Sequence, residues 1–315
     1  MWAYALTAPG RLERLDVPDP RAEAPGDVVV RLHAGGICGS DLPSFLGRRN
    51  EFIDCSGEPG YPLHEVVGEV LSGDADLAPG TRVVGWPAGH KGLAEVFVAH
   101  ADQLLALGGE LDAVQATVIQ PLATVLHALD RLPDVRGKRV AVLGQGPIGL
   151  LFTRVLKRRG AAHVTGVDRV DRRETARAFG VDEPVWGDAA AWAAELGDER
   201  PELVVEAVGH QTGTLEDAVA ALADRGTVLA FGVPDDSHYP FPFRRFFRKH
   251  ATLLAGATTE RRAALAAARD YLRDDPGLLE PYVTDVLPAT CAQEAFERAL
   301  APAPGRLKVV LDAEA

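Results

Sequence analysis

The sequence predicts an α/β protein in which a β-rich domain precedes a doubly wound parallel sheet. From Lys138 onward, strand-like and helix-like runs alternate at the spacing of βαβ units, whose right-handed crossovers imply parallel strands. Before about residue 100, the apolar runs are short and bounded by glycine, proline or aspartate, as strands joined by turns are. A glycine-rich turn at the start of the alternating region is the third observation.

The first part of the chain contains strand-like runs and no convincing helical period. The runs are residues 28–32, 65–71, 81–86 and 94–98. From about residue 112 to 132, apolar residues fall on one helical face, and we expect Pro121 to bend or break this run. The aromatic residues Phe45, Phe52, Trp86 and Phe97 are interpreted as core or interface residues, and Arg48 and Arg49 as a solvated loop.

The second part alternates, and a tail follows it. Strands are expected at 139–143, 164–168, 203–208, 227–231 and 252–254, and helices at 148–159, 172–179, 188–196 and 215–223. The tail predicts helices at 260–273 and 292–300 and a strand at 307–311. We expect the tail to complete the first domain, so that residues 1–121 and 259–315 form one domain and residues 122–258 the other.

The glycine-rich turn predicts a dinucleotide site. Gly144, Gly146 and Gly149 form the pattern GxGxxG, with Pro147 and Ile148 opening the helix that follows. The first glycine suits a tight turn, the second a close approach of backbone to a pyrophosphate, and the third close packing of helix on strand. Asp168 ends the next strand, at the spacing of an acid that binds a ribose diol. This region is therefore predicted to be a Rossmann domain.

Composition excludes several classes of function. The 315-residue chain has 33 basic and 45 acidic residues and a formal net charge of −12, which argues against nucleic acid or an anionic membrane surface as partner. No apolar run reaches the roughly 18 residues of a membrane span, and the first residues lack the pattern of a signal peptide. Three widely spaced cysteines do not make a disulfide framework, so we expect a cytoplasmic protein with reduced thiols.

Two motifs in the first domain could carry chemistry. Cys38 lies in GGICGSD and His64 in PLHEVVGEV, each beside glycine or proline turns and a carboxylate. An isolated cysteine or histidine is more often a buried or turn residue than a ligand. Together, a thiolate and an imidazole suit a tetrahedral zinc that keeps one position open.

The sequence resembles the zinc-containing alcohol and polyol dehydrogenases of the medium-chain dehydrogenase/reductase superfamily. Within that family it is most similar to the sorbitol, threonine and glucose dehydrogenases. The shared segments, in order, are GICGSD, HEVVGEV, PLATVLHAL from Pro121, GQGPIG, Asp168 and the closing KVVL from Lys308. The resemblance covers nearly the whole chain and implies a GroES-like catalytic domain beside the Rossmann domain.

The resemblance also implies roles for individual residues. Cys38 and His64 would bind a catalytic zinc, Asp41 would orient His64, and Ser40 would contact the reacting oxygen and begin the proton relay. On the coenzyme, Arg173 would lie beside the adenine ribose, and Val208 and Gly232 would lie at the strand ends that flank the nicotinamide.

Three departures from the family pattern stand out. Gln120 replaces the carboxylate or cysteine expected as third zinc ligand, so we expect Glu65 as a ligand or near-ligand and Gln120 as a ligand directly or through water. Pro43 stands where many relatives have a histidine that relays the proton, and proline cannot do so; the ribose hydroxyls and water, or Glu65, would replace it. The four cysteines of a structural zinc are missing between Trp86 and Leu93, so one catalytic zinc and no structural zinc is expected.

Asp168 favours NAD over NADP, because a carboxylate accepts from both ribose hydroxyls and repels a 2′-phosphate. Arg169, Arg172 and Arg173 could instead pair with such a phosphate, although Arg172 can also be interpreted as a solvated helix start.

The predicted function is a zinc-dependent transfer of hydride between NAD(H) and a secondary alcohol or ketone of a polyol, sugar or cyclitol. One alternative is a zinc-free reductase on the same fold, and another is a catalytically weakened NAD-binding relative. The expected partners are a small-molecule substrate and further copies of the chain, in a homodimer or homotetramer.

Overall fold

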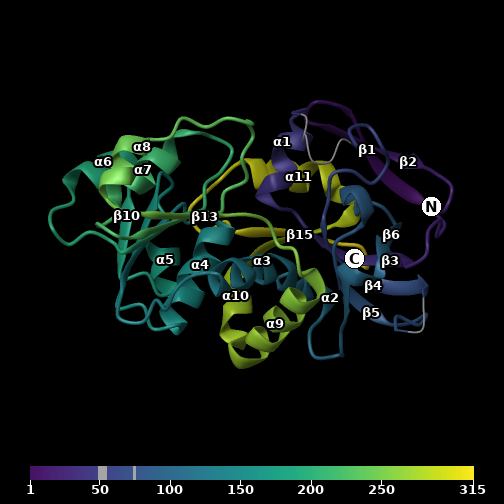
Figure 1. Cartoon of the computed structure of the whole chain (residues 1–315). Coiled ribbons are helices and arrows are strands. Elements are labelled where there is room, and N and C mark those ends of the chain that lie inside the picture. The colour runs from purple at the N-terminus through teal and green to yellow at the C-terminus, as the bar shows by residue number, and fades with distance from the viewer. Residues whose placement is uncertain (49–54, 74–75) are drawn as a thin grey trace. The chain divides into compact units, whose positions relative to one another are not determined.

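The computed structural model describes residues 1–48, 55–73 and 76–315, so Arg49 and Phe52 lie outside the described residues. The chain divides into two compact units. Unit 1 comprises Met1–Thr124, Thr259–Pro302 and Arg306–Ala315, and unit 2 comprises Val125–Thr258 and Ala303–Gly305. In Figure 1, the purple N-terminal strands and the yellow C-terminal strand β15 both belong to unit 1.

Unit 2 is built on a six-stranded sheet in which every pair is parallel. Its strands, in the order in which they lie in the sheet, are β10 (Glu183–Trp186), β9 (His163–Asp168), β8 (Arg139–Leu143), β11 (Leu203–Glu206), β12 (Thr227–Ala230) and β13 (Thr252–Ala255). Numbered along this unit, the order is 3-2-1-4-5-6, which is that of a dinucleotide-binding Rossmann sheet. The strand order reverses between β8 and β11, so the turn after β8 lies at the switch point.

The helices of unit 2 follow the strands. They are α4 (Pro147–Arg158), α5 (Arg173–Ala178), α6 (Ala189–Glu195), α7 (Gly213–Ala221) and α8 (Phe243–Arg248). The first four match the predicted helices within two residues at both ends. The short helix α8 was not predicted. Its Phe243 and Phe247 are exposed, so its apolar residues do not mark a buried helical face in the sequence.

Unit 1 has a seven-stranded sheet and a separate hairpin of β1 (Trp2–Ala8) and β2 (Arg11–Asp16). The sheet contains, in order, β14 (Val283–Pro288), β15 (Lys308–Asp312), β3 (Asp27–Gly36), β4 (Glu65–Ser72), β5 (Arg82–Gly85) and β7 (Leu104–Ala106), with β6 (Val96–His100) paired to β3. Only β14 and β15 are parallel; the other pairs are antiparallel. The long strand β3 therefore lies between the tail strand β15 and β4.

The helices of unit 1 come from the first part of the chain and from the tail. They are α1 (Leu42–Phe45), α2 (Ala113–Ala116), α9 (Arg261–Asp274), α10 (Leu279–Tyr282) and α11 (Ala292–Leu300), and α3 (Ile119–Asp130) contains the boundary between the units. The run that we expected Pro121 to bend or break is broken into two helices. The break falls at Thr117 and Val118, and Pro121 lies in the first turn of α3, where its missing N–H has no helical partner to lose.

The unit 1 core joins the hairpin, the sheet and the tail. Phe45 packs against Phe296 of α11 with ring centroids 5.0 Å apart, and both rings are buried. Phe97 and Trp86 are buried as well, which confirms the prediction that these aromatic residues belong to the core. The tail thus contributes apolar side chains to the same core as the first hundred residues.

Candidate metal centre and dinucleotide site

The metal-centre residues lie where β3 ends and β4 begins. Gly36 at the end of β3 pairs with Glu65 at the start of β4. Cys38 follows Gly36 by two residues and His64 precedes Glu65 by one, so the antiparallel pairing brings the two motifs together. One ligand atom from each of Cys38, His64 and Glu65 lies within 4.8 Å of the other two.

Asp41 orients the histidine of this cluster. His64 Nδ1 lies 2.6 Å from Asp41 Oδ1, and Asp41 Oδ2 accepts from the Cys38 N–H at 3.0 Å. Burial alone would raise the pKa of Asp41, but the charge and hydrogen bond of His64 outweigh it and hold the pKa below its usual value. An ionised Asp41 must accept from Nδ1–H, which fixes the tautomer of His64 and leaves Nε2 as its metal-ligating nitrogen.

Ser40 is partly exposed, whereas Gln120 is buried. The Ser40 hydroxyl donates to Cys38 Sγ at 3.3 Å, and both residues keep part of their surface exposed, whereas Asp41, His64 and Glu65 are buried. The open side of the cluster is therefore the side of Cys38 and Ser40. Gln120 is buried in the first turn of α3.

Glu65 forms a buried ion pair that the sequence did not reveal. Lys308 Nζ lies 2.9 Å from Glu65 Oε1 and 2.7 Å from Oε2, donates to the carbonyl of Ile37 at 3.1 Å, and is 2% exposed. Lys308 of β15 and Glu65 of β4 meet over the strand β3 that lies between theirs. Gly36 of β3 leaves the space for this contact, because an added Cβ there would lie 2.3 Å from Glu65 Oε2. Burial would lower the pKa of Lys308, but the Glu65 charge raises it, so the ammonium stays charged.

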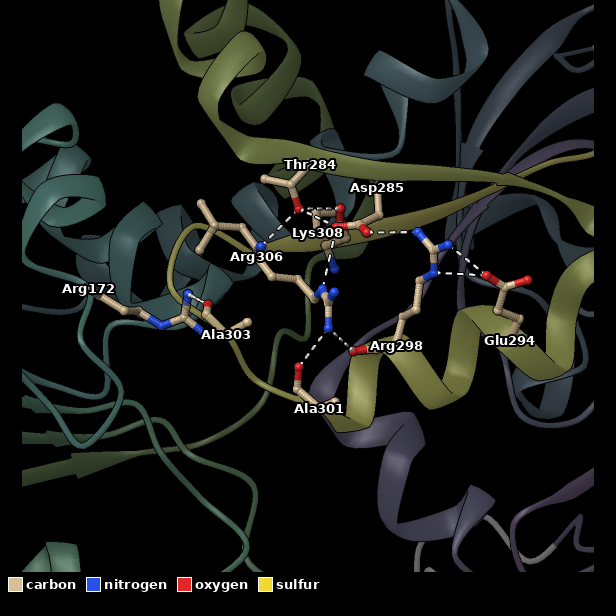
Figure 2. Close-up of polar contacts among 10 residues, drawn as sticks. Arg172, Thr284, Asp285, Glu294, Arg298, Ala301, Ala303, Arg306 and Lys308 are labelled. Atoms are coloured by element: carbon tan, nitrogen blue, oxygen red, sulfur yellow. Dashed lines mark hydrogen bonds and ion pairs between the residues drawn. The ribbon is translucent and has the colours of Figure 1, made fainter.

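The tail strand that carries Lys308 is fixed by its neighbours, as Figure 2 shows. Thr284 Oγ1 accepts from the N–H of Leu307 at 2.9 Å, next to Lys308. Arg298 of α11 bridges Asp285 and Glu294 with contacts of 3.2 and 2.6 Å. These contacts join β14 to α11 and to the residue just before β15, the strand that carries Lys308.

His90 is a second residue that sequence reasoning missed. Its ring centroid lies 4.5 Å from that of His64, at an interplanar angle of 33°. The His90 carbonyl accepts from the Leu63 N–H at 2.9 Å, which ties the short segment after Trp86 to the residue before the ligand. Burial, with the charge of His64, lowers the pKa of His90 to about 3, so its imidazole is neutral. The only sequence signal was a histidine within a glycine-bounded turn.

The predicted dinucleotide turn has the expected backbone. Gly144 has a φ of +85°, which favours glycine, and a Cβ at Gly149 would lie 1.8 Å from the Gly144 carbonyl oxygen. Gly146 is the N-cap of α4, with Pro147 and Ile148 as its first residues, and a Cβ on Gly146 would meet nothing within 4 Å. The turn is therefore tight where the chain crosses itself and open at the end of the helix that suits a phosphate.

Asp168 ends β9 beside this turn. Its Oδ2 accepts from the Gln145 N–H at 2.6 Å and its Oδ1 from the Val170 N–H at 2.7 Å. Each oxygen keeps a further lone pair that a ribose hydroxyl can use. The carboxylate is thus fixed by backbone groups at the lip of the glycine turn.

Two of the three arginines that follow Asp168 pair with other aspartates, whereas Arg172 Nε lies 3.8 Å from Asp168 Oδ2 itself. Arg173 forms a two-point contact with Asp171 at 2.9 and 2.8 Å and lies over the Trp186 ring, and Arg169 pairs with Asp188. The interpretation of Arg172 as a solvated helix start is wrong. It is 6% exposed and its Nη1 donates to the Ala303 carbonyl at 3.2 Å within unit 2, as Figure 2 shows.

Val208 and Gly232 follow the ends of β11 and β12 and are organised by Glu206. This buried carboxylate accepts from the N–H groups of Val208 and Gly209 at 3.0 and 3.1 Å and from the Thr214 hydroxyl at 2.7 Å. A Cβ at Gly232 would lie 2.2 Å from the Gly209 nitrogen, so only glycine fits. Glu206 was not predicted, because an acid that ends an apolar strand has no distinctive local pattern.

Comparisons with known proteins identify the family of this chain. Residues 24–118 match the alcohol dehydrogenase GroES-like domain, and residues 147–271 match the zinc-binding dehydrogenase domain. The chain is 30% identical over 302 residues to D-altritol 5-dehydrogenase of Agrobacterium fabrum, covering 84% of this chain and 86% of the relative. The chain therefore belongs to the zinc-type medium-chain dehydrogenase/reductase family, and it is an alcohol or polyol dehydrogenase.

Two further comparisons agree. Sorbitol dehydrogenase of Gallus gallus is 28% identical over 261 residues, which is 71% of this chain and 72% of the relative. The structure of alcohol dehydrogenase TADH from Thermus sp. ATN1 is similar with a TM-score of 0.84 and 29% identity, covering 99% of this chain and 100% of that one. These comparisons confirm the predicted family and fold class. No helix in the described parts of the chain is long and apolar enough to span a membrane.

Proposed function

We propose that this protein is a zinc- and NAD-dependent dehydrogenase that interconverts a secondary alcohol and a ketone of a polyol, sugar or cyclitol. The observation that carries the proposal is the cluster of Cys38, His64 and Glu65, whose ligand atoms lie within 4.8 Å of one another beside the Asp41–His64 hydrogen bond. We assign unit 1 the role of catalytic domain and unit 2 that of coenzyme-binding domain.

The donor set fits zinc. Cys38 offers a thiolate, His64 offers Nε2 because Asp41 holds Nδ1, and the partly exposed side of Cys38 leaves room for a substrate oxygen. Glu65 offers a carboxylate whose charge Lys308 already partly balances. Gln120 completes the site, as a ligand through its amide oxygen or through water. A neutral amide beside a lysine-bound carboxylate makes a less negative site than two free carboxylates would.

The catalytic roles follow from position. Bound zinc supplies a Lewis acid for the alcohol oxygen, and bound nicotinamide supplies the hydride acceptor. Ser40 lies on the open side of the cluster, and we assign it the contact with the reacting oxygen and the first acceptance of its proton. Asp41 keeps His64 in one tautomer throughout.

The proton must then leave without a relay histidine. Pro43 has no group that carries a proton, and both oxygens of Glu65 are engaged by Lys308, so Glu65 is poorly suited to a shuttle. We therefore assign the step beyond Ser40 to the remaining alternative, hydroxyl groups and water at the open side of the site.

The arginines after Asp168 support NAD rather than NADP. Arg169 and Arg173 are paired with other aspartates, and Arg172 is buried between Asp168 and the Ala303 carbonyl, so each guanidinium already has an oxygen neighbour within the protein. Asp168 itself, fixed by two backbone N–H groups, suits a ribose diol. Arg173 would then line the ribose with its stem rather than with its charge.

The proposal includes self-association and a cytoplasmic location. The edge strand β13 has Leu253 38% exposed, and Phe243 and Phe247 of the preceding helix α8 are 66% and 69% exposed, which suits a homodimer that continues the sheet. The three cysteines form no disulfide, in keeping with a reducing compartment.

The test combines metal analysis with a screen of polyols, sugars and cyclitols followed by NADH absorbance. We expect one zinc per chain, turnover of at least one secondary alcohol, and loss of turnover on chelation and in Cys38→Ser. Full activity after chelation and in Cys38→Ser would favour the zinc-free reductase. Tight NADH binding without turnover of any alcohol or ketone would favour the weakened NAD-binding relative.

A further inference from the structure

Arg261, the first residue of α9, is half-buried at one end of the unit 1 sheet. Its Cζ lies 5.1 Å from the centroid of the Trp86 ring, and its Nη1 donates to the side-chain oxygen of Gln103. The next residue, Arg262, donates from Nε to the Leu104 carbonyl at 3.0 Å and so ties the start of α9 to β7. The Arg261 guanidinium is therefore held in place by a ring on one side and an amide on the other.

This end of the sheet is the end from which the metal centre projects. The strand β5 pairs with β4 on one side and with β7 on the other. Continued by one residue, the register sets Trp86 opposite Glu65, and the Trp86 N–H donates to the Gln103 carbonyl at 3.2 Å. Adjacent strands lie about 4.8 Å apart, so the backbone of Gln103 is roughly 10 Å from that of Glu65, a separation comparable to the length of an extended hexitol that carries a phosphate.

The charge of Arg261 lacks a direct acidic partner. Its neighbours on α9, Arg262, Arg269 and Arg273, each pair with an aspartate. Within the parts of the chain that the structure describes, no carboxylate forms an ion pair with Arg261, and Gln103 alone links it to Asp102. Burial lowers the pKa of Arg261.

The Trp86 ring and the Gln103 oxygen replace only part of the hydration that this half-buried guanidinium loses, and an anionic ligand can supply the missing carboxylate or phosphate partner. The Arg261 guanidinium has five N–H groups, and Gln103 accepts from only one of its nitrogens, Nη1. The planar fork that remains matches a carboxylate or a phosphate by two parallel hydrogen bonds, which a lysine cannot form.

We propose that Arg261 binds an anionic group of the substrate, so that the enzyme prefers polyols that carry a carboxylate or a phosphate over neutral polyols. The inference rests on the proposed function, because it names the substrate class of that same site. It assigns the metal-centre end of the substrate to Cys38, Ser40 and His64, and the far end to Arg261.

The test compares kcat/KM with NAD for a hexitol, the matching hexonate and the matching hexitol phosphate. We expect the wild type to prefer one anionic compound, and which one it prefers distinguishes carboxylate from phosphate. Arg261→Ala should lower kcat/KM for that compound about 10- to 100-fold more than for the hexitol. Arg261→Lys should recover only part of this loss, and Arg269→Ala, on the same helix, should match the wild type.

A calorimetric titration of the hexonate, and of inorganic phosphate, into the wild-type protein and Arg261→Ala gives a readout without turnover. The inference predicts binding of one of these anions that weakens about 10-fold or more in the variant. It is overturned if neither anion binds, or if both proteins bind them equally. It is overturned equally if the wild type oxidises the neutral hexitol as well as the anionic compounds, in which case the proposed function still stands. No oxidation of any alcohol, with anion binding that depends on Arg261, would instead contradict the proposed function.

Discussion

The buried pair of Lys308 and Glu65 offers a quantitative test of how the metal centre is supported. In Lys308→Met the side chain keeps its length, but Glu65 loses the ammonium that lies 2.7 and 2.9 Å from its oxygens. Both side chains are at most 2% exposed, so water cannot take the place of the missing cation. Removing one partner of such a pair costs about 3–5 kcal/mol, most of it from the uncompensated charge left behind.

The assay is native-state amide hydrogen exchange in β3 and β4, measured on zinc-free protein so that metal binding by Glu65 does not intervene. A loss of about 4 kcal/mol should accelerate exchange of the slowest amides there by about 1000-fold. The double variant Lys308→Met/Glu65→Gln removes both charges and should recover much of the loss.

Lys91→Met is the matched control, because Lys91 pairs with Glu58 at 2.9 Å on the surface of the same unit, with side chains 40% and 51% exposed. Exposed pairs contribute about 0–1 kcal/mol, so exchange in β3 and β4 should hardly change. The reasoning fails if Lys308→Met is as mild as Lys91→Met, or if the double variant is no more stable than the single one.

Three other predictions concern the sites directly. Asp41→Asn should weaken zinc binding about 10- to 100-fold in a chelator competition, because an amide holds the His64 tautomer less firmly; unchanged zinc affinity would argue against the orienting role. Gly149→Val should weaken NADH binding at least 10-fold in a fluorescence titration, since its Cβ would lie 1.8 Å from the Gly144 carbonyl oxygen. Gly187→Ala is the control, because a Cβ there meets nothing within 4 Å. Equal NADH affinities of the two variants would contradict the assignment of the glycine turn to the coenzyme. Asp168→Ala should reduce the affinity for NAD about 10-fold and lower the ratio of NAD affinity to NADP affinity. An unchanged ratio would show that other residues distinguish NAD from NADP.

Local patterns were sufficient where the structure is local. The strand β8 and the helix α11 span the predicted residues, because an apolar run with turns on both sides and a 3.6-residue period each specify one element. The motifs of Cys38 and His64 could be associated from the sequence, and the pairing of Gly36 with Glu65 gives the physical reason for their proximity.

The remaining features depend on contacts far apart in the chain. Lys308 and Glu65 are separated by 243 positions, and their meeting requires that β15 lie beside β3, a sheet order that no local pattern states. His90 lies beside His64 because its carbonyl accepts a hydrogen bond from the N–H of Leu63. Arg261 lies over the Trp86 ring because α9, a helix of the tail, packs against the first part of the chain. The burial of Arg172 follows in the same way from its contact with Ala303.

The zinc content of the purified chain tests the central claim most directly. Elemental analysis of protein prepared without chelator should find one zinc per chain in the wild type and almost none in Cys38→Ser or His64→Ala, because each removes a ligand from the cluster. Gly187→Ala, which leaves that cluster untouched, should retain the wild-type content. A wild-type chain without zinc, or zinc that persists in both ligand variants, would contradict the account.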